Sequence, residues 1–395
     1  MSLPFRTWTQ PPHAPGRVLA IATWQQAALT FVRFGVPALA PFLRADFGLS
    51  LSQIGFVMGS INLGAFFAFY PTGRATAHYG ERRIMTAGSA VVALACVALL
   101  FANTWGAIAA GLAVAGIGFP SSQIAGSRAV YGAFDQRRRG LAMGIRQAGL
   151  PLGGLLAALV LPSLADHGGW RAAIGAAAAI ALSGGIFCLG MPRSRQYSTD
   201  ATKQSGRAAI RQFLTRPDLL GITAMAMLLA VSQFCILSYL PLYLVDDFHL
   251  PRAVAALSLI GLQIGGIIGR MLWGHVSDRL ANGNRTGTLI AVCLAGAVAA
   301  VTLTTGTATA VYGLAIVAGA TTLGWNGLYV TLLNERLDRN AATLLSLSMM
   351  CLYIIALFAP PLFGQVIEAV GYRWAWVGLV VPQLAAAGLA WRVGR

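Results

Sequence analysis

Long apolar runs decide what this chain can fold into. Twelve stretches of mostly apolar residues follow one another along the 395 residues, each close to the length of about 20 residues that a helix needs to cross a membrane. Charged residues make up 10% of the chain, whereas soluble domains carry about 25%. We therefore predict an all-α membrane protein with twelve transmembrane helices. They cover roughly residues 18–42, 53–73, 84–102, 106–131, 141–163, 170–191, 218–244, 252–276, 287–305, 309–334, 343–366 and 373–392.

A polar segment divides the twelve predicted helices into two groups of six. Residues 192–217 lie between the sixth and the seventh helix, contain six basic residues and have little apolar content. We predict an N-terminal tail at residues 1–17, a six-helix bundle at 18–191, a linker at 192–217 and a second six-helix bundle at 218–395.

The basic residues predict the orientation of the chain in the membrane. Lys and Arg collect in the cytoplasmic loops of membrane proteins. With both termini on one side, twenty of the 28 basic residues lie at that face and four lie at the other, so both termini and the linker are predicted to be cytoplasmic. All but one of the 28 are arginine, which we interpret as bacterial codon usage, and the predicted location is the bacterial inner membrane.

The two predicted bundles carry matching loops. After the second helix of the first bundle the sequence reads GRATAHYGERR from Gly73, and after the second helix of the other bundle it reads GHVSDRLANGNR from Gly274. Equal helix counts and matching loops indicate two parallel repeats about an axis normal to the membrane. Transporters of this build bind their solute near the middle of the membrane, between the repeats.

These features resemble the major facilitator superfamily over essentially the whole chain. The superfamily carries the loop signature G-x-x-x-D-R-x-G-R-[RK] between its second and third helices. The matching residues are Gly274, Asp278 and Arg279 in the second half and Gly73, Gly80 and Arg82 in the first half. The first half departs from the signature because Ala77 and His78 replace its Asp and Arg. The resemblance implies two pseudo-symmetric six-helix bundles, a transporter rather than an enzyme, and a conformational switch in which the matching residues clamp neighbouring helices.

Glycines recur at helical spacing on the fifth and eighth predicted helices. They are Gly149 and Gly153 on helix 5 and Gly261, Gly265 and Gly269 on helix 8. Such stripes let helix backbones approach closely in lipid. In the superfamily these two helices face each other between the halves, which implies a smooth interface on which the halves rock; the alternative is ordinary packing within one bundle. The run GLPLGG at 149–154 also resembles a signature of drug/proton antiporters, which favours an exporter.

Three arginines within the predicted spans are candidates for binding the solute. Arg33 lies near the middle of the first span, Arg270 lies four residues before Gly274, and Arg146 lies one to two turns into the fifth span. An arginine is costly in lipid and usually faces a cavity or marks a transport path. The alternatives are a structural hydrogen bond to the backbone or a side chain that extends to the membrane surface. The resemblance adds that monocarboxylate carriers of the superfamily hold an anion-binding arginine at the position of Arg270.

No acidic residue accompanies these arginines. All twelve Asp and Glu residues lie in predicted loops or at helix ends. A positive site without a counter-charge favours an anion, and a carboxylate matches the planar guanidinium. We therefore predict transport of a small carboxylate-like or inorganic anion by alternating access. Other span residues that could line the site are Gln26, Gln123, Tyr239 and Asn326, within a wider polar and aromatic set that includes Asn62 and Tyr353.

Several alternatives remain open at this stage. A proton could travel with the anion, or one anion could be exchanged for another. The same scaffold could serve as an efflux pump for drugs or amphipathic compounds, or as a sensor that has lost transport. An enzyme is disfavoured because the spans lack a catalytic cluster. The five cysteines lie singly in apolar runs, so we expect no metal and no cofactor, and we expect a monomer in the lipid bilayer with no nucleic-acid partner.

Overall fold

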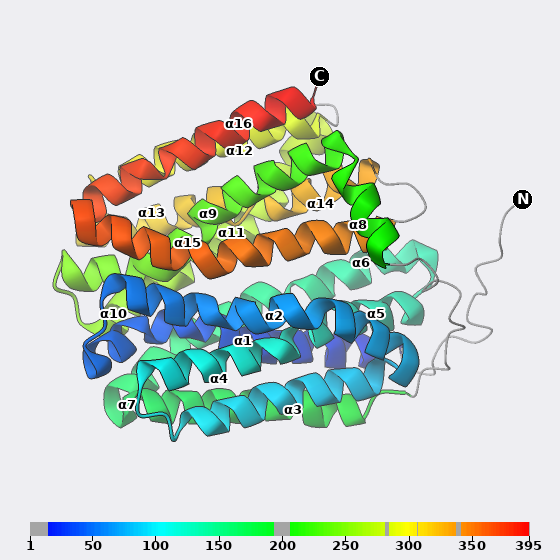
Figure 1. Cartoon of the computed structure of the whole chain (residues 1–395), viewed down its shortest axis with the longest axis horizontal. Coiled ribbons are helices and arrows are strands. Elements are labelled where there is room, and N and C mark those ends of the chain that lie inside the picture. The colour runs from blue at the N-terminus through cyan, green and yellow to red at the C-terminus, as the bar shows by residue number, and fades with distance from the viewer. Residues whose placement is uncertain (1–14, 193–205, 281–283, 306, 337–340, 395) are drawn as a thin grey trace, which may run out of the picture.

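The computed structural model describes residues 15–192, 206–280, 284–305, 307–336 and 341–394. These residues form helices and no strand, which confirms the predicted all-α membrane fold (Figure 1). In chain order the α-helices are α1 (Pro15–Phe47), α2 (Leu51–Tyr79), α3 (Glu81–Leu99), α4 (Trp105–Pro120), α5 (Ser127–Ala133), α6 (Gln136–Gln147), α7 (Gly149–Leu189), α8 (Gly206–Leu214), α9 (Pro217–Asp246), α10 (Arg252–Ala256), α11 (Ser258–His275), α12 (Arg285–Thr302), α13 (Ala308–Thr322), α14 (Asn326–Glu335), α15 (Ala341–Gly378) and α16 (Val380–Val393).

Ten helical segments of the described chain are long and apolar enough to cross a membrane. Two of them, Leu141–Leu189 and Leu347–Val393, are 49 and 47 residues long, so each measures about 70 Å against a hydrocarbon layer of about 30 Å. Each is interrupted by a glycine with positive φ, Gly169 at +74° and Gly371 at +79°. Each long segment is therefore long enough for two crossings, and counting both twice would give the twelve predicted spans.

The two halves of the chain repeat the same backbone features. Gly48 and His249 have positive φ values of +61° and +54°, and each follows an Asp-Phe pair in the sequence. Gly169 and Gly371 break their helices in the same way and at the same place in each half. The left-handed conformation is costly for a residue with a side chain, so its recurrence at His249 supports a repeated architecture that the sequence showed only in its loops.

The repeat extends to a break in the middle of one span of each half. The fourth span passes from α4 into a π-helix at Ser121–Gly126 and then into α5. The tenth span breaks between the end of α13 at Thr322 and the start of α14 at Asn326. Irregular backbone at membrane depth is tolerated only where protein or a water-filled cavity surrounds it. The two breaks therefore indicate the interior of the molecule and not its lipid surface.

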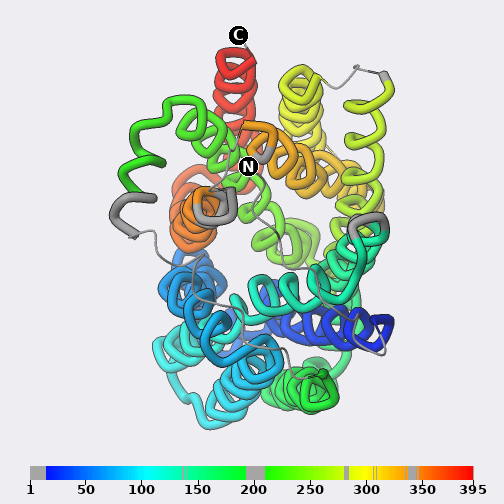
Figure 2. The backbone as a smooth tube through the Cα atoms, turned by 90° about the vertical axis from the view of Figure 1, so that its right-hand side faces the viewer, coloured from blue at the N-terminus to red at the C-terminus, as the bar shows by residue number. Residues whose placement is uncertain are grey.

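The helices run roughly side by side between two faces of the molecule (Figure 1). The terminal face is the one where α1 begins and α16 ends. The opposite face carries the turns at Gly48, Asn103, Gly169, His249, Thr305 and Gly371. Most of the helices α1 to α7 pack mainly on one another, as do most of α9 to α16, and the two groups form two layers when seen end-on (Figure 2). The layers meet where α15 packs on α2 and where α10 and α11 pack on α7.

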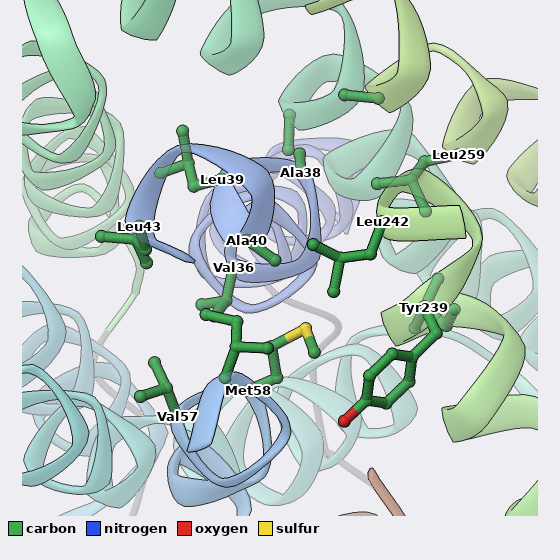
Figure 3. Packing of buried hydrophobic residues seen from close by; sticks show 14 of the residues in the cluster. Val36, Ala38, Leu39, Ala40, Leu43, Val57, Met58, Tyr239, Leu242 and Leu259 are labelled. Atoms are coloured by element: carbon green, nitrogen blue, oxygen red, sulfur yellow. The ribbon is translucent and has the colours of Figure 1, made fainter. Parts of the chain in front are cut away.

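The apolar core joins the two halves on one side only. One cluster of buried residues contains side chains of both halves, including Val36, Met58, Tyr239 and Leu259 (Figure 3). Toward the terminal face the core divides into two separate clusters, one confined to the first half around Met85 and one confined to the second half. The halves are therefore packed together toward the opposite face and have separate cores at the terminal face.

Helices α2 and α15 form the tightest contact between the halves, and glycines make it possible. A Cβ atom added at Gly55 would lie 2.7 Å from the carbonyl oxygen of Pro360, and one at Gly59 would collide with the carbonyl of Leu357. On the other helix, a Cβ at Gly364 would collide with the carbonyl of Leu51. We call this contact the α2–α15 seam.

The predicted glycine interface between helices 5 and 8 is wrong in this structure. The glycines on helix 8 face the backbone of α13 in their own half, and those on helix 5 face the backbone of α1 in theirs. Glycine spacing reports a close helix contact but does not identify the partner, and here the partner is within the bundle. Gly154 is the helix 5 glycine that meets the other half, at Gln263 of α11. The glycines that were predicted at the interface but face a helix of their own half are Gly149, Gly153, Gly261, Gly265 and Gly269.

The α2–α15 seam predicts the effect of one methyl group. Gly59→Ala should push the halves apart at the opposite face, because the new Cβ meets a backbone carbonyl that no side-chain rotation can move. The measurement is the distance between spin labels on the exposed residues Asn103 and Thr305, with Cys351 replaced by alanine, and we expect it to lengthen. Gly265→Ala is the matched control: it collides with α13 inside one half and should lower the unfolding midpoint without lengthening the distance. An unchanged distance in Gly59→Ala would contradict the seam.

Candidate functional site

Arg33 lies near the middle of α1 and reaches both halves of the molecule. Its Nη2 donates a hydrogen bond of 2.6 Å to Oδ1 of Asn62 on α2, and its Nη1 donates one of 3.3 Å to the hydroxyl of Tyr353 on α15. Its Cζ lies 5.0 Å from the ring centre of Tyr353 and 5.9 Å from that of Phe119, within the range of cation–π attraction. The side chain is only partly buried.

Asn62 is the residue that orients Arg33. Its Nδ2 donates hydrogen bonds of 3.2 Å to the carbonyls of Gly59 and Ala356, so both amide hydrogens are used and the oxygen is left to face the guanidinium. Since Ala356 and Tyr353 belong to the second half, Arg33 lies at the inner end of the α2–α15 seam. Asn62 and Tyr353, two members of the wider polar set, thus prove to be the direct partners of Arg33.

The charge of Arg33 has no counter-ion among the described residues. Its two hydrogen-bond partners are neutral, and none of the ion pairs of the described chain involves it. The described acids lie at helix ends or next to helix breaks, as the sequence predicts. An arginine near the middle of a membrane helix costs about 2.5–3.5 kcal/mol even on the most lenient scales. Neutral partners reduce that cost but leave a net positive charge at this depth.

Arg270 on α11 is the second uncompensated arginine. It is partly buried and forms no hydrogen bond or ion pair with a residue that the structure describes. Gln263, seven residues earlier, contacts Gly154 of the first half. Residues seven apart share a helix face, so Arg270 lies on the side of α11 that faces the first half, about 10 Å closer to the terminal face.

Arg146 occupies a different environment from the one we predicted. Its side chain is fully buried inside the first half, where Nη2 donates to the carbonyl of Ser122 and Nη1 donates to Oε1 of Gln147 at 3.4 Å. Gln26, also fully buried, donates to the same Gln147 oxygen at 3.0 Å. Arg146 therefore supports the π-helix from inside the bundle, and Gln26 is tied to α6 through Gln147. Neither side chain is accessible in this conformation, and their contact with a solute stays a prediction.

Tyr239 also has a structural role. Its hydroxyl lies 2.7 Å from the carbonyl oxygens of both Leu51 and Pro360, and the ring is buried in the shared apolar core (Figure 3). The residue joins α9 to the α2–α15 seam and presents no free polar atom to a solute. In this conformation the side chain is therefore not accessible to a solute, and its contact with one stays a prediction.

The two remaining candidates lie at the two helix breaks. Gln123 is part of the π-helix, is partly exposed, and its side-chain amide bonds to no residue that the structure describes. Asn326 is the first residue of α14, where its Nδ2 donates 3.2 Å to Oε1 of Gln233 on α9. Each half thus places an amide side chain at its own break. Their contact with a solute stays a prediction.

A second polar cluster closes the opposite face. Arg44 at the end of α1 forms an ion pair with Asp246 at the end of α9, and the hydroxyl of Tyr372 donates 2.8 Å to the same carboxylate. Nearby, Glu368 accepts a hydrogen bond of 3.0 Å from the backbone N–H of Ser52. We call these residues the opposite-face lock. Sequence reasoning missed it, although Arg44 was one of only four basic residues assigned to that face.

Hydrogen bonds and ion pairs between the halves occur only from the opposite face to mid-depth in the described chain. They are Ser52–Glu368, Leu51–Tyr239, Arg44–Asp246, Asn62–Ala356 and Arg33–Tyr353. At the terminal face, the ion pairs of the described residues stay within one half. Together with the divided core, these contacts show that the two halves are closed against each other at the opposite face.

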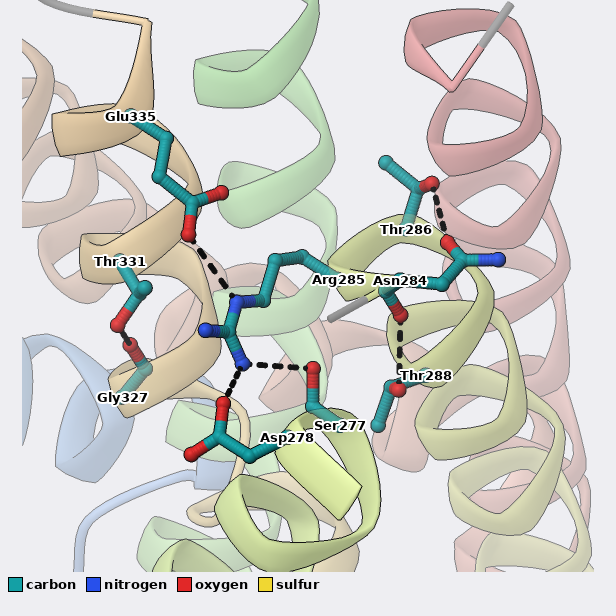
Figure 4. A network of polar contacts seen from close by, with 9 residues as sticks. All are labelled: Ser277, Asp278, Asn284, Arg285, Thr286, Thr288, Gly327, Thr331 and Glu335. Atoms are coloured by element: carbon teal, nitrogen blue, oxygen red, sulfur yellow. Dashed lines mark hydrogen bonds and ion pairs between the residues drawn. The ribbon is translucent and has the colours of Figure 1, made fainter. Parts of the chain in front are cut away.

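One switch residue of the second half, Asp278, belongs to a compact polar network at the terminal face (Figure 4). Arg285 at the start of α12 donates to the carboxylate of Asp278, to Oγ of Ser277 at 2.9 Å, and to Oε1 of Glu335 at 3.2 Å. The π-helix Val276–Leu280, which follows α11, is thereby tied to the end of α14. Arg279 is exposed and Gly274 has open space beside it, so neither contributes to the network in this state.

The first half makes the corresponding tie with the charges reversed. Glu81 at the start of α3 is buried, and its Oε1 forms an ion pair with Nε of Arg128 on α5 at 2.9 Å. In the second half the basic residue, Arg285, is at the start of α12 and the acidic residue, Glu335, is at the end of α14. Gly80, with φ at +83°, makes the sharp junction of α2 and α3. The loop that departs from the signature is thus still tied to the fourth span. Of its remaining matching residues, Gly73 and Arg82 are partly exposed.

Comparison with known proteins decides the family. The sequence model of the Major Facilitator Superfamily matches residues 24–360. The chain belongs to this superfamily. An uncharacterized MFS-type transporter of Mycobacterium tuberculosis, Rv2994, is 29% identical over 362 residues, which cover 90% of this chain and 80% of that protein. The membrane sensor protein UhpC of Escherichia coli is 29% identical over 154 residues, 34% of this chain and 35% of that protein.

Solved structures agree with the superfamily fold. A bacterial homolog of the human lysosomal transporter Spinster, in an inward-facing and occupied conformation, gives a TM-score of 0.80 at 16% identity and covers 97% of each chain. The nucleoside transporter NupG gives 0.78 at 14% identity, over 94% of this chain and 99% of that one. This superfamily protein is accordingly a multi-pass membrane transporter, and family and fold point away from an enzyme. Its described residues hold no group of three or more metal-ligating side chains.

The opposite-face lock predicts contrasting effects at two neighbouring acids. Asp246→Asn removes the charge that pairs with Arg44. It should lower the free energy that keeps the opposite face closed by about 1 kcal/mol or less, because both partners are partly exposed. At Asp247, burial first and then the charge of Asp246 raise the pKa of the carboxyl above its ordinary value. Asp247→Asn should therefore relieve repulsion and keep the face closed.

The same pair of spin labels at Asn103 and Thr305 measures both variants. We expect a larger fraction of long distances for Asp246→Asn than for the unsubstituted protein, and no such increase for Asp247→Asn. Equal opening by both substitutions would show that the lock acts through general charge and not through the contact between Asp246 and Arg44.

Proposed function

We propose that this transporter moves a small anionic solute, carboxylate-like or inorganic, across a bacterial inner membrane by alternating access. The observation that carries this proposal is the net charge of Arg33. Its guanidinium is partly exposed, lies near the middle of a spanning helix, and has neutral hydrogen-bond partners only among the described residues. An anion that binds next to this guanidinium is attracted more strongly than in water, because the protein interior screens the two charges less. A neutral or cationic solute would leave the charge uncompensated.

The hydrogen bonds of Arg33 are compatible with the arrival of a solute. The bond to Asn62 is short at 2.6 Å, whereas the bond to Tyr353 is long at 3.3 Å. A carboxylate accepts two parallel hydrogen bonds from one guanidinium and would compete with the tyrosine hydroxyl more readily than with the amide. Asn62 would then continue to orient the arginine while the solute replaces a contact between the halves.

Arg270 supports an anionic cargo from the other half. It lies on the face of α11 that is turned toward the first half, and it has no partner among the described residues. We infer that Arg33 provides the first contact and that Arg270 contributes positive potential along the path from the terminal face. Gln123 and Asn326, at the two helix breaks, are the neutral candidates for the same path.

The alternating-access step follows from the division of the chain. We propose that the bundles at residues 18–191 and 218–395 rock about the α2–α15 seam, joined by the linker at 192–217. With the terminal face in the cytoplasm, as the basic residues predict, the state described above is closed to the outside. No acid of the described chain lies beside Arg33, so the coupling we favour is exchange of one anion for another or a proton carried by the anion itself.

Transport in proteoliposomes tests the proposal. Arg33→Gln should reduce uptake of a transported anion by about 10- to 100-fold, the equivalent of one charge-assisted hydrogen bond of about 1.5–3 kcal/mol. Arg33→Lys should retain part of the activity because it keeps the charge but loses the fork. Arg171→Gln is the matched control, since this arginine bonds to the carbonyls of Leu100 and Ala102 at the opposite face.

Three outcomes would overturn the proposal. Full anion uptake by Arg33→Gln would remove the role of the guanidinium. Anion binding by the intact protein without any uptake would indicate a sensor, as the relative UhpC is named. Continued export of amphipathic compounds by the Arg33→Gln variant would favour the efflux alternative.

A further inference from the structure

The short helix α8 differs in direction from the helices around it. It contains nine residues, Gly206–Leu214, and contacts α9 and α15. At the terminal face it runs steeply across the direction of these two helices (Figure 1). The spanning helices are aligned with the membrane normal, so α8 lies closer to the membrane plane.

Local contacts hold α8 in this position. Pro217 begins α9, and a residue that precedes proline is pushed out of the helical region; Arg216 is accordingly extended. Its guanidinium donates two hydrogen bonds, of 2.9 and 2.6 Å, to the carboxylate of Asp218, and one of 3.1 Å to the carbonyl of Arg336. Phe213 anchors the helix in the apolar core of the second half, where it is 6% exposed. The crossing angle is therefore built into the fold.

The outer side of α8 carries two large apolar residues. Ile210 is 47% exposed and Leu214 is 60% exposed, and a spacing of four places them on one side of the helix. Arg211 beside them is exposed as well. Since α8 ends at Leu214 and the spanning helix α9 begins at Pro217, this stripe lies at the depth where a span leaves the membrane.

We propose that α8 is an interfacial helix that inserts Ile210 and Leu214 into the surface of the bilayer and binds anionic lipid headgroups through Arg211. At this depth an apolar side chain reaches the boundary of the acyl chains, and a neighbouring arginine reaches the headgroup phosphates. Basic residues next to a span are attracted to anionic lipids. The lipid surface is the occupant that matches both the position of the stripe and its charge. The proposal does not depend on the identity of the transported solute.

Site-directed spin labelling in vesicles tests this proposal. With Cys351 replaced by alanine, because the other four native cysteines are buried, labels are placed at Ile210→Cys and Leu214→Cys. Thr215→Cys is the control, since Thr215 is exposed but lies about 140° around the helix from Ile210. We expect the labels at 210 and 214 to collide more with oxygen, which concentrates in lipid, and the control to collide more with a water-soluble nickel complex.

The headgroup is tested with two lipid compositions. Vesicles of phosphatidylcholine are compared with vesicles that also contain phosphatidylglycerol, and we expect the label at Leu214→Cys to become less mobile when the anionic lipid is present. Arg211→Gln should abolish this difference while the oxygen collisions at Leu214→Cys remain.

Three results would overturn the proposal. Greater collision with the nickel complex at 210 and 214 would place the stripe in water. Equal mobility in the two lipid compositions would remove the anionic headgroup as ligand. Dipolar broadening between labels on two molecules would show that a second copy of the chain covers the stripe.

Discussion

The low dielectric of the membrane is the constraint on which the rest of this structure depends. Backbone groups must be hydrogen-bonded within the protein, so the described residues form helices, and the helix breaks lie in spans that face the interior. The same constraint makes each buried charge costly. The ion pairs of the described chain lie at its two faces, and the arginines at depth are the exceptions. Arg33 is one of these exceptions, is partly accessible, and has neutral hydrogen-bond partners only among the described residues. We therefore expect it to bind the solute.

We propose that the position of Arg33 links solute binding to movement of the halves. The opposite-face lock is partly exposed and each of its contacts contributes little, so the packing of α2 on α15 keeps that face closed. Arg33 and Asn62 lie where this packing ends, and both bond to residues of the second half. A solute that displaces Tyr353 from Arg33 removes one of the innermost contacts between the halves. Occupancy of the site is thereby coupled to the stability of the closed face.

The sequence predicted the fold well because lipid makes apolar length and charge placement decisive. It also identified Arg33 correctly as an arginine without an acidic partner, since the absence of acids from the spans is a property of composition. Helix rotation was the part that could not be predicted. Tyr239, Arg146 and the helix 8 glycines lie on spanning helices, as predicted, but their side of the helix is turned into a bundle or toward the seam. In a span that is apolar on all sides, periodicity does not distinguish lipid from protein, so only the packed structure reveals which face meets the other half.

The central claim is that the site at mid-depth selects its solute by negative charge. The most direct measurement is the thermal unfolding midpoint of the purified protein against a panel of small carboxylates and inorganic anions, each carboxylate paired with its uncharged amide. Ligand binding to the folded state raises the midpoint by mass action. The account predicts that at least one anion raises it in a saturable way and that the matching amide does not. Equal stabilisation by the charged and uncharged members of every pair would contradict it.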